Sequence, residues 1–454
     1  MKANPKITEI TDDEETKPLL DSFTESDNQL QTSIFDVPEE LGAIDTEEPP
    51  KDDDFTTEVT AITLLADKSL QKSTVKIKMP IVCLTMIVKN ESKIMKRCLE
   101  STKDFVDCVC ITDTGSDDNT IETIENWCTT HKMPYKVFTD TFKGFGVSRT
   151  QSFNNAKASF PEADYSFLLD ADMVLEMPNF DKASLTLPAY RISQTNSGLL
   201  YPNTRLISTG DPWKLVCRTH EFWESPALAR QGTIPYEQLR IKDLNDGGCK
   251  AGKFKRDLKL LKQDIHEEIH VPRNTFYLAQ TYKDLGKTHQ AIKRYKKRIN
   301  LGAWPDEIWY SHYMIGTCYF RISQAAIDES DDNEPDIAAE ADALRHLLKA
   351  FNDKPNRAEP LMELATYYRK RGMNVLTYHF AKLALTCDPK GELLFVEQSK
   401  YTWEPQFEIC ITGYYLGKKV EGLAACELLL TEFKDQMPAH IKAQVNLNKK
   451  FYQK

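Results

Sequence analysis

From Ile81 onward the chain alternates short apolar runs with longer stretches in which apolar residues recur at helical spacing. Short runs of this kind are typical of buried strands, and the longer stretches of amphipathic helices. Strands are expected at 81–88, 106–111, 135–138 and 165–169, and helices around 94–99, 121–128 and 147–160. Strands that alternate with helices predict a parallel, doubly wound sheet.

Beyond residue 172 the pattern becomes that of paired strands. Alternating apolar positions at 189–193 and 199–208 flank a turn at Asn196-Ser-Gly198, which is a hairpin signal. A further strand is expected over 213–223. Paired strands are therefore expected after the parallel part of the sheet.

From Arg256 to the end the pattern predicts helices in pairs. Small and aromatic residues within 277–295 are spaced as in a tetratricopeptide helix hairpin. Similar spacing returns around Gly372 and, more loosely, around Gly417, a separation of 45 residues where the standard repeat has about 34. Each hairpin must bury its apolar face against the next, so an irregular superhelical array with a concave groove is expected.

The first part of the chain differs from the rest in charge and in apolar content. Residues 1–58 hold eighteen Asp and Glu against four Lys and Arg, a charge of −14, so the net charge of −10 leaves +4 for the remainder. Too few apolar residues are present there to offset the entropy lost when a chain is ordered. We therefore expect a disordered acidic tail over 1–78.

Composition also disfavours several functional classes. The longest apolar run, 81–88, is too short to cross a bilayer, and no basic region followed by an apolar core stands at the N-terminus, so neither an integral membrane segment nor a secretory signal is expected. The eleven cysteines lack metal-ligand spacing, which favours a reduced, cytoplasmic compartment. A remainder charge of +4 makes no basic face, so no nucleic acid partner is expected.

Carboxylates follow three of the expected strands. Lys89-Asn90-Glu91 follows the first, Asp113 opens a polar loop after the second, and Asp170-Ala-Asp172 follows the fourth. The carboxyl ends of parallel strands meet at one sheet edge, where such folds bind their ligands. The Asp-x-Asp spacing puts two carboxylates on one side of the chain, where they could share Mg²⁺ or Mn²⁺.

These loops also have ordinary structural interpretations. Asp is common in solvated turns, so the Asp-x-Asp could simply end a strand. Ser116 or Asp118 could cap the helix that follows the second loop. If the acids do face a nucleotide, either a cation bridges them to its phosphates, or they bind hydroxyls and base edges.

Two later segments carry further polar chemistry. A single histidine is more often structural than a ligand, but His220 adjoins Glu221 and follows the acidic site in the chain, which favours a functional pair. The segment 243–256 combines glycines with clustered cations, as in a mobile loop that closes over phosphate. A charged surface linker that opens a helix explains the same composition equally well.

Taken together, the acidic loops resemble the family 2 glycosyltransferases of the GT-A fold. The anchors stand in the family's order and spacing: Leu84-Thr-Met-Ile-Val-Lys-Asn-Glu-Ser92, Ile111-Thr-Asp-Thr-Gly-Ser-Asp-Asp-Asn-Thr120, Phe145-Gly-Val-Ser-Arg149 and Leu168-Leu-Asp-Ala-Asp172. They cover residues 80 to about 175, and the combination is far more specific than any one motif. With helical repeats appended, the layout is similar to a subgroup that includes bacterial peptide S-glycosyltransferases.

The resemblance implies an α/β GT-A domain over 79–255, with a mixed, mostly parallel sheet that binds a nucleotide-sugar. An all-α tetratricopeptide-like domain over 256–454 would follow. The implied activity is that of a hexosyltransferase-like glycosyltransferase that depends on Mn²⁺ or Mg²⁺. Its donor would be a nucleotide-diphosphate sugar, with a UDP-sugar as the first expectation. Its acceptor would be a protein, peptide or glycan, and the helical repeats could hold a protein or peptide acceptor.

The resemblance also assigns roles to single residues. Glu221 would be the base that activates the acceptor. The donor would be bound by Asn90, Glu91, Asp113, Arg149, Asp170 and Lys253. The metal would be bound by Asp172, with Asp170, His220 and Asp246 as further ligands. The third ligand stays open, because Asp243, Asn245 and Asp246 stand where relatives often have a His or Asp before a glycine pair, and Met173 replaces an acid common in the family.

Such a site would catalyse a direct displacement with inversion. The metal would neutralise the leaving diphosphate, while a carboxylate removes the acceptor's proton during attack from the opposite face. One alternative is a non-catalytic scaffold with a degenerate transferase domain, although both aspartates of the Asp-x-Asp are present. A second is a nucleotidyltransferase, which would prefer a basic, glycine-rich loop to Lys89-Asn90-Glu91.

Overall fold

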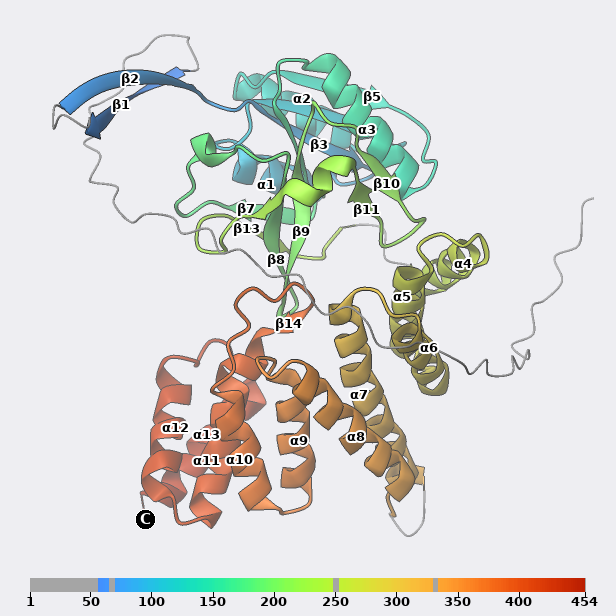
Figure 1. The fold of residues 1–454 in the computed structure, drawn as a ribbon, viewed down its shortest axis with the longest axis vertical. Coiled ribbons are helices and arrows are strands. Elements are labelled where there is room, and N and C mark those ends of the chain that lie inside the picture. The colour runs from blue at the N-terminus through green and yellow to red at the C-terminus, as the bar shows by residue number, and fades with distance from the viewer. Residues whose placement is uncertain (1–55, 65–69, 248–252, 330–333, 454) are drawn as a thin grey trace, which may run out of the picture. The chain divides into compact units, whose positions relative to one another are not determined.

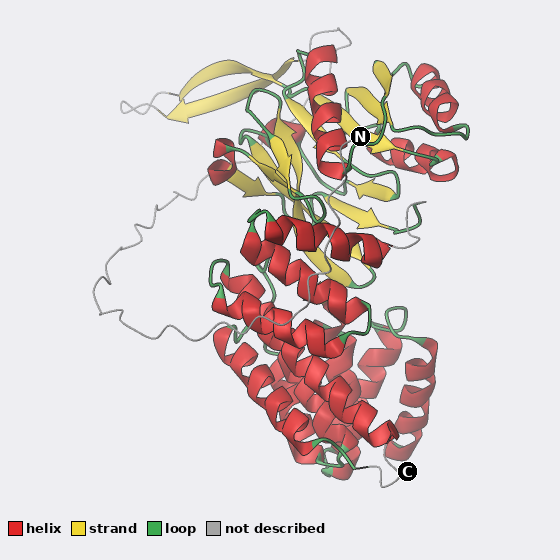
Figure 2. Ribbon diagram, turned by 90° about the vertical axis from the view of Figure 1, so that its right-hand side faces the viewer, coloured by secondary structure: helices red, strands yellow, loops and turns green. Residues whose placement is uncertain are grey.

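The computed structural model describes residues 56–64, 70–247, 253–329 and 334–453 (Figure 1). Strands and helices are mixed in the first part, and helices make up nearly all of the chain from residue 253 onward (Figure 2). No helix within these ranges combines the length and the apolar character that a membrane span requires.

Four parallel strands form the first half of the main sheet, in the spatial order β5-β4-β3-β6. The alternation of strands and helices predicted from the apolar pattern is confirmed. Strands β3 and β4 are almost wholly buried, which explains their continuous apolar sequence. The bounds are β3 Val82–Val88, α1 Ser92–Thr102, β4 Cys108–Asp113, α2 Thr120–Thr130, β5 Tyr135–Thr139, α3 Phe145–Ser159 and β6 Tyr165–Leu168.

Beyond β6 the sheet continues in the order β9-β8-β13-β7 with strands of both directions. The pairs β6/β9, β8/β9 and β7/β13 are antiparallel, whereas β8 is parallel to β13 and to β12. The expected hairpin joins β8 to β9, and the sheet is mixed, as predicted. The bounds are β7 Met173–Glu176, β8 Ala189–Asn196, β9 Leu199–Ser208, β12 Gln231–Thr233 and β13 Arg240–Asp243.

The strand expected over 213–223 is interrupted. Its two ends form β10 (Lys214–Val216) and β11 (Phe222–Glu224), which pair antiparallel with each other in a separate sheet. Between them Cys217 and His220 have left-handed backbones, with φ of 70° and 51°. Left-handed residues cannot continue a strand, so the prediction of one continuous strand was wrong.

A hydrophobic core includes residues of β3, β4 and β6. Phe167 of β6 and Phe105 are both almost fully buried, and their rings meet edge to face at 5.1 Å. Met95 and Leu99 of α1 belong to the same fully buried cluster. This packing holds β6 in place, and with it the Asp-x-Asp loop that begins two residues after the strand ends.

The helical part consists of ten helices within the described ranges, each packed against the next (Figure 1). Gly286, Gly372 and Gly417 follow α5, α9 and α11 with φ of 72°, 70° and 68°, so the three predicted hairpins share the same left-handed glycine turn. The bounds are α4 Lys253–His266, α5 Val271–Asp284, α6 Thr288–Asn300, α7 Pro305–Glu329, α8 Ile337–Asp353, α9 Glu359–Lys370, α10 Asn374–Ala384, α11 Trp403–Tyr415, α12 Lys419–Thr431 and α13 Ala439–Tyr452.

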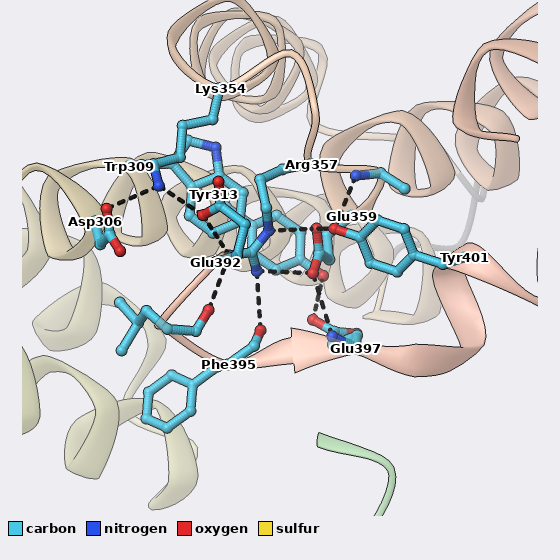
Figure 3. Close-up of polar contacts among 12 residues, drawn as sticks. Asp306, Trp309, Tyr313, Lys354, Arg357, Glu359, Glu392, Phe395, Glu397 and Tyr401 are labelled. Atoms are coloured by element: carbon cyan, nitrogen blue, oxygen red, sulfur yellow. Dashed lines mark hydrogen bonds and ion pairs between the residues drawn. The ribbon is translucent and has the colours of Figure 1, made fainter. Parts of the chain in front are cut away.

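The segment between α10 and α11 returns to the sheet. Strand β14 (Val396–Glu397) pairs antiparallel with Leu199 and Leu200 of β9. Arg357, which is fully buried, holds the preceding segment by donating to the carbonyls of Leu394 and Phe395 at 2.9 and 3.0 Å (Figure 3). A buried cation with several acceptors is costly to remove, so this network fixes the strand that the helical part adds to the sheet.

The predicted disordered tail falls largely outside the described residues, which exclude 1–55 and 65–69. The rest of 56–78 differs from the expectation, because β1 (Thr56–Leu64) and β2 (Leu70–Lys78) pair antiparallel with each other. Both segments are rich in β-branched residues, which favour strands. The low apolar content of the whole tail concealed this local preference.

Candidate functional site

The loops after β3 and β4 interlock at the carboxyl edge of the sheet. The amide of Asn90 donates to the Ser116 hydroxyl at 2.9 Å, and the Asn90 side chain accepts from the Asp117 amide at 2.9 Å. The amide of Glu91 donates to the Thr120 hydroxyl at 2.8 Å. Two loops that the sequence placed at one edge are thus held together by direct hydrogen bonds.

Asp113 lies at the base of this pair of loops and is almost fully buried. Its carboxylate accepts from the amides of Gly115 and Ser116 at 2.9 and 2.8 Å and from the Ser116 hydroxyl. Gly115 has φ of 104°, a conformation that favours glycine. The carboxylate therefore shapes the loop that follows β4.

The capping interpretation holds for Asp118 and not for Ser116. Asp118 accepts from the amides of Thr120 at 3.0 Å and Ser92 at 3.2 Å, so it serves the first residues of both α2 and α1. Burial acts to raise the pKa of Asp118, but these hydrogen bonds outweigh it and lower the pKa to about 2. Asp118 thus stabilises the first turns of α1 and α2 at this edge of the sheet.

Asp170, the first acid of the Asp-x-Asp, lies between two arginines. Arg149 of α3 donates to its Oδ1 at 2.6 Å, and Arg205 of β9 donates to its Oδ2 at 3.2 Å. Burial opposes ionisation, but the two guanidinium groups outweigh it and lower the pKa of Asp170 to about 2. Asp170 is therefore an ionised carboxylate that fixes both arginines.

Asp172, the second acid, has the opposite environment. Burial and the charges of Asp170 and Asp243 raise its pKa. No ion pair joins Asp172 to a cation within the described part of the chain. A β-carbon placed on Gly247 would lie only 3.1 Å from Asp172 Oδ2 and 3.4 Å from Glu91 Oε1, so the backbone there approaches both carboxylates closely. The negative charge gathered at Asp172 suits a cation.

Glu221 lies on the other side of Arg149. Its Oε1 is 3.6 Å from Arg149 Nη1, and its side chain is only 10% exposed. That oxygen is buried and has no hydrogen-bond partner among the described residues. Burial raises the pKa of Glu221, and Arg149 offsets this only in part. Arg149 thus connects an ionised aspartate to a glutamate that can accept a proton.

His220 and Asp246, two of the expected metal ligands, have other partners. The His220 ring stacks on Tyr277 of α5, with ring centroids 4.0 Å apart. Burial, Arg273 and Lys253 lower the pKa of His220 to about 3, so its ring is neutral. Asp246 forms a bidentate pair with Arg97, with both N–O distances 2.8 Å.

The fit to a metal can be judged from this donor set. No group of three or more His, Cys, Asp or Glu side chains in the described ranges is arranged to hold an ion. Mg²⁺ in phosphate-binding sites commonly takes one or two protein carboxylates and completes its shell with water and substrate phosphates. Asp172 fits that mode, whereas a closed cage of four protein ligands does not.

Lys253 is the first residue of α4 and is exposed. It lies close enough to His220 to lower the pKa of that histidine. Residues 248–252 of the expected phosphate loop lie outside the described residues. Nearby, the guanidinium carbons of Arg149 and Arg256 lie 5.2 and 5.8 Å from the ring centroid of Phe145. These contacts connect α3 to the start of α4.

Two arginines of the site were not singled out from the sequence. Arg205 binds Asp170 and also donates to Gln194 at 2.8 Å, and Arg97 binds Asp246. The sequence did carry a signal for Arg205, because it stands beside the apolar Leu206 and Ile207 in an expected strand. A cation in such a strand is favourable only if a buried acidic or polar group pairs with it. For Arg97, an exposed position on a helix, no signal was present.

Comparisons with known proteins agree with this geometry. Residues 83–182 match the family model described as glycosyl transferase family 2. The chain is similar to the SPbeta prophage-derived glycosyltransferase SunS of Bacillus subtilis, with 22% identity over 256 residues that cover 53% of this chain and 58% of SunS. The chain thus spans little more than half the length of this curated relative.

Among solved structures the similarities are more distant. S. aureus TarS is 12% identical, with 56% of this chain and 54% of TarS covered and a TM-score of 0.31. MamA is 17% identical, with 41% of this chain and 91% of MamA covered and a TM-score of 0.31. The family model, in contrast, covers the loops that hold Asn90, Asp113, Arg149, Asp170 and Asp172. Residues 83–182 of this chain are therefore similar to glycosyl transferase family 2.

Proposed function

We propose that this chain transfers a sugar from a nucleotide-diphosphate sugar to an acceptor, with the help of a divalent metal ion and with inversion at the anomeric carbon. The observation that carries the proposal is a row of charged side chains, in which Arg149 joins Asp170 at 2.6 Å to buried Glu221 at 3.6 Å. Asp170 and Arg149 lie within the residues that match the family 2 model, and Glu221 lies beyond them in the chain. Donor chemistry would take place at the aspartates and acceptor chemistry at Glu221.

The donor half of the proposal concerns the loops at the sheet edge. Asn90, Glu91 and Asp113 would line the nucleoside pocket, and Lys253 would approach the phosphates. Asp172 would hold Mn²⁺ or Mg²⁺, which when bound neutralises the charge that develops on the leaving diphosphate. The support for this assignment is geometric: the backbone at Gly247 approaches the carboxylates of Asp172 and Glu91 closely. Burial and the charges of Asp170 and Asp243 raise the pKa of Asp172, which agrees with a site that a cation would stabilise.

The acceptor half of the proposal concerns Glu221. A buried carboxylate with a raised pKa is a better proton acceptor near neutral pH than an exposed one. Glu221 would take the proton from the attacking group of the acceptor, while Arg149 and Arg205 hold Asp170 on the donor side. A base and a leaving group on opposite faces of the sugar give a single displacement with inversion.

The acceptor itself is proposed as a protein, peptide or glycan. Helical arrays of the kind formed by α4–α13 present extended surfaces that suit a chain-like ligand. A UDP-sugar is the donor class to test first, followed by sugars carried on other nucleotides.

A thermal-shift screen tests the proposal directly. The protein is heated with each nucleotide-sugar in Mn²⁺, in Mg²⁺ and in a chelator, and release of the nucleoside diphosphate is then measured for any sugar that stabilises it. We expect stabilisation by one donor class that requires the metal, and slow hydrolysis of that donor. Asp172→Ala should abolish hydrolysis while the melting temperature without donor stays nearly constant. Full activity in Asp172→Ala would remove the metal from the mechanism, and no response to any donor would reject the transferase.

A further inference from the structure

The loop that delivers Glu221 has an unfavourable backbone. Cys217 and His220 both have positive φ, and neither is glycine. Residues with a β-carbon are unfavourable in this conformation and persist in it only where their surroundings hold them in place. The position of Glu221 therefore depends on contacts made by residues 217–220.

Those contacts come from the first helices of the helical part. Arg273 of α5 donates to the carbonyl of His220, with Nη2 at 3.1 Å and Nε at 3.4 Å. The same guanidinium lies over the ring of Phe222, 4.8 Å from its centroid. Arg273 thus contacts both chain neighbours of Glu221, His220 and Phe222.

Tyr277 stands one helical turn after Arg273, on the same face of α5. Its ring stacks on that of His220 with the planes 8° apart, and Arg273 lies 4.9 Å from its centroid. His220 is therefore held twice, through its carbonyl by Arg273 and through its ring by Tyr277. A left-handed residue fixed at both its backbone and its side chain has little freedom to relax.

Helix α4 secures the rest of the loop. Asp264, which is fully buried, accepts from the amide of Arg218 at 2.8 Å and also pairs with the Arg218 side chain. Thr219 donates to buried Asp257 at 3.1 Å. The residues between the two short strands are therefore bound by α4 and α5 together, and not by the transferase sheet alone.

On these grounds we propose that Arg273 and Tyr277 are positioning residues, which hold the His220 backbone so that Glu221 faces Arg149 and the sugar-transfer site. This inference rests on the proposed function. Neither residue would touch the reacting atoms. The first hairpin of the helical part would then complete the catalytic centre of the transferase domain, in addition to any role of the array in acceptor binding.

Packing between the two parts would explain the same contacts without any effect on chemistry. The two explanations differ in what a substitution changes. Lost packing lowers the melting temperature and leaves kcat unchanged in the molecules that remain folded. Lost positioning lowers kcat, because a displacement of about 1 Å in a catalytic group can cost about 100-fold in rate, and it leaves the KM for the donor unchanged.

The test uses the full chain with Arg273→Gln, Arg273→Lys, Tyr277→Leu and Tyr277→Phe. Lysine keeps a positive charge near Glu307, which lies 3.9 Å from Arg273, and so protects folding, but it lacks the planar fork that reaches the His220 carbonyl. Phenylalanine keeps the stacked ring that leucine removes. Lys293→Gln, at an exposed position on α6, is the control for loss of a cation.

We expect kcat to fall about 10- to 100-fold in Arg273→Gln and Tyr277→Leu, with donor KM within about twofold of wild type. Arg273→Lys should be intermediate, Tyr277→Phe should retain most of the turnover that Tyr277→Leu loses, and Lys293→Gln should match wild type. If Glu221→Gln is inactive but kcat is unchanged in Arg273→Lys and Tyr277→Leu, the positioning role is refuted and the proposed function stands. A wild-type chain without turnover on any nucleotide-sugar would overturn the proposed function, and this inference with it.

Discussion

The two acids of the Asp-x-Asp should affect stability in opposite directions, although they lie two residues apart. Asp170 is held by Arg149 at 2.6 Å and by Arg205 at 3.2 Å, and its side chain is about a quarter exposed. Its pKa falls from an ordinary 3.8 to about 2. A shift of this size corresponds to about 2 kcal/mol of folding free energy, so Asp170→Asn should lower the free energy of unfolding at pH 7 by about that amount.

Asp172→Asn should behave differently, because burial and neighbouring acids raise the pKa of Asp172. Removal of its charge relieves repulsion, so stability at pH 7 should be unchanged or higher while activity is lost. Asp104→Asn, at an exposed site, serves as a control for replacing an aspartate. Urea denaturation of the three variants and wild type at pH 7 measures the differences.

The pH dependence offers a second check on Asp170. A depressed pKa means that the stabilising charge is fully present above the ordinary pKa of 3.8 and is lost as the pH falls through about 2. The difference in stability between wild type and Asp170→Asn should therefore shrink between pH 4 and pH 2. Equal losses at pH 7 for Asp170→Asn and Asp172→Asn would refute the reasoning, as would no loss for Asp170→Asn.

Three other predictions concern single side chains. Glu221→Gln should lower kcat by about 10²- to 10⁴-fold, since it removes the proposed base, without lowering the melting temperature. Glu224→Gln, at the end of β11, should retain activity, and equal turnover in both variants would exclude Glu221 as the base. Gly247→Ala should weaken metal-dependent donor binding, because its β-carbon would stand 3.1 Å from Asp172 Oδ2; unchanged affinity in a donor titration would show that the carboxylate can shift freely. Burial and a neighbouring histidine lower the pKa of His346 from 6.5 to about 4, so the unfolded chain takes up a proton that the folded chain excludes. The free energy of unfolding of wild type should therefore fall by up to about 3 kcal/mol between pH 6.5 and pH 4. A denaturation series in which the free energy of unfolding of His346→Gln falls by as much would contradict this.

Much of the fold could be predicted from local pattern alone. Burial on both faces makes a parallel strand apolar throughout, so the runs near β3, β4 and β6 could be recognised as strands. The interruption near His220 could not, because its left-handed backbone depends on partners in α4 and α5. The two-residue strand β14 could not be predicted either, since two residues are too few to show a periodic pattern.

The sequence by itself determined the alternation of strands and helices, the edge at which the acidic loops gather, and the family to which residues 83–182 are similar. Only the tertiary structure decided how each charge is used. Asp170 and Asp172 have the same side chain, yet Arg149 and Arg205, 21 and 35 residues away, lower the pKa of the first, while burial and nearby acids raise the pKa of the second. The physical reason is that periodicity is a short-range property of the chain, whereas the pKa of a buried group depends on charges brought near it only by folding.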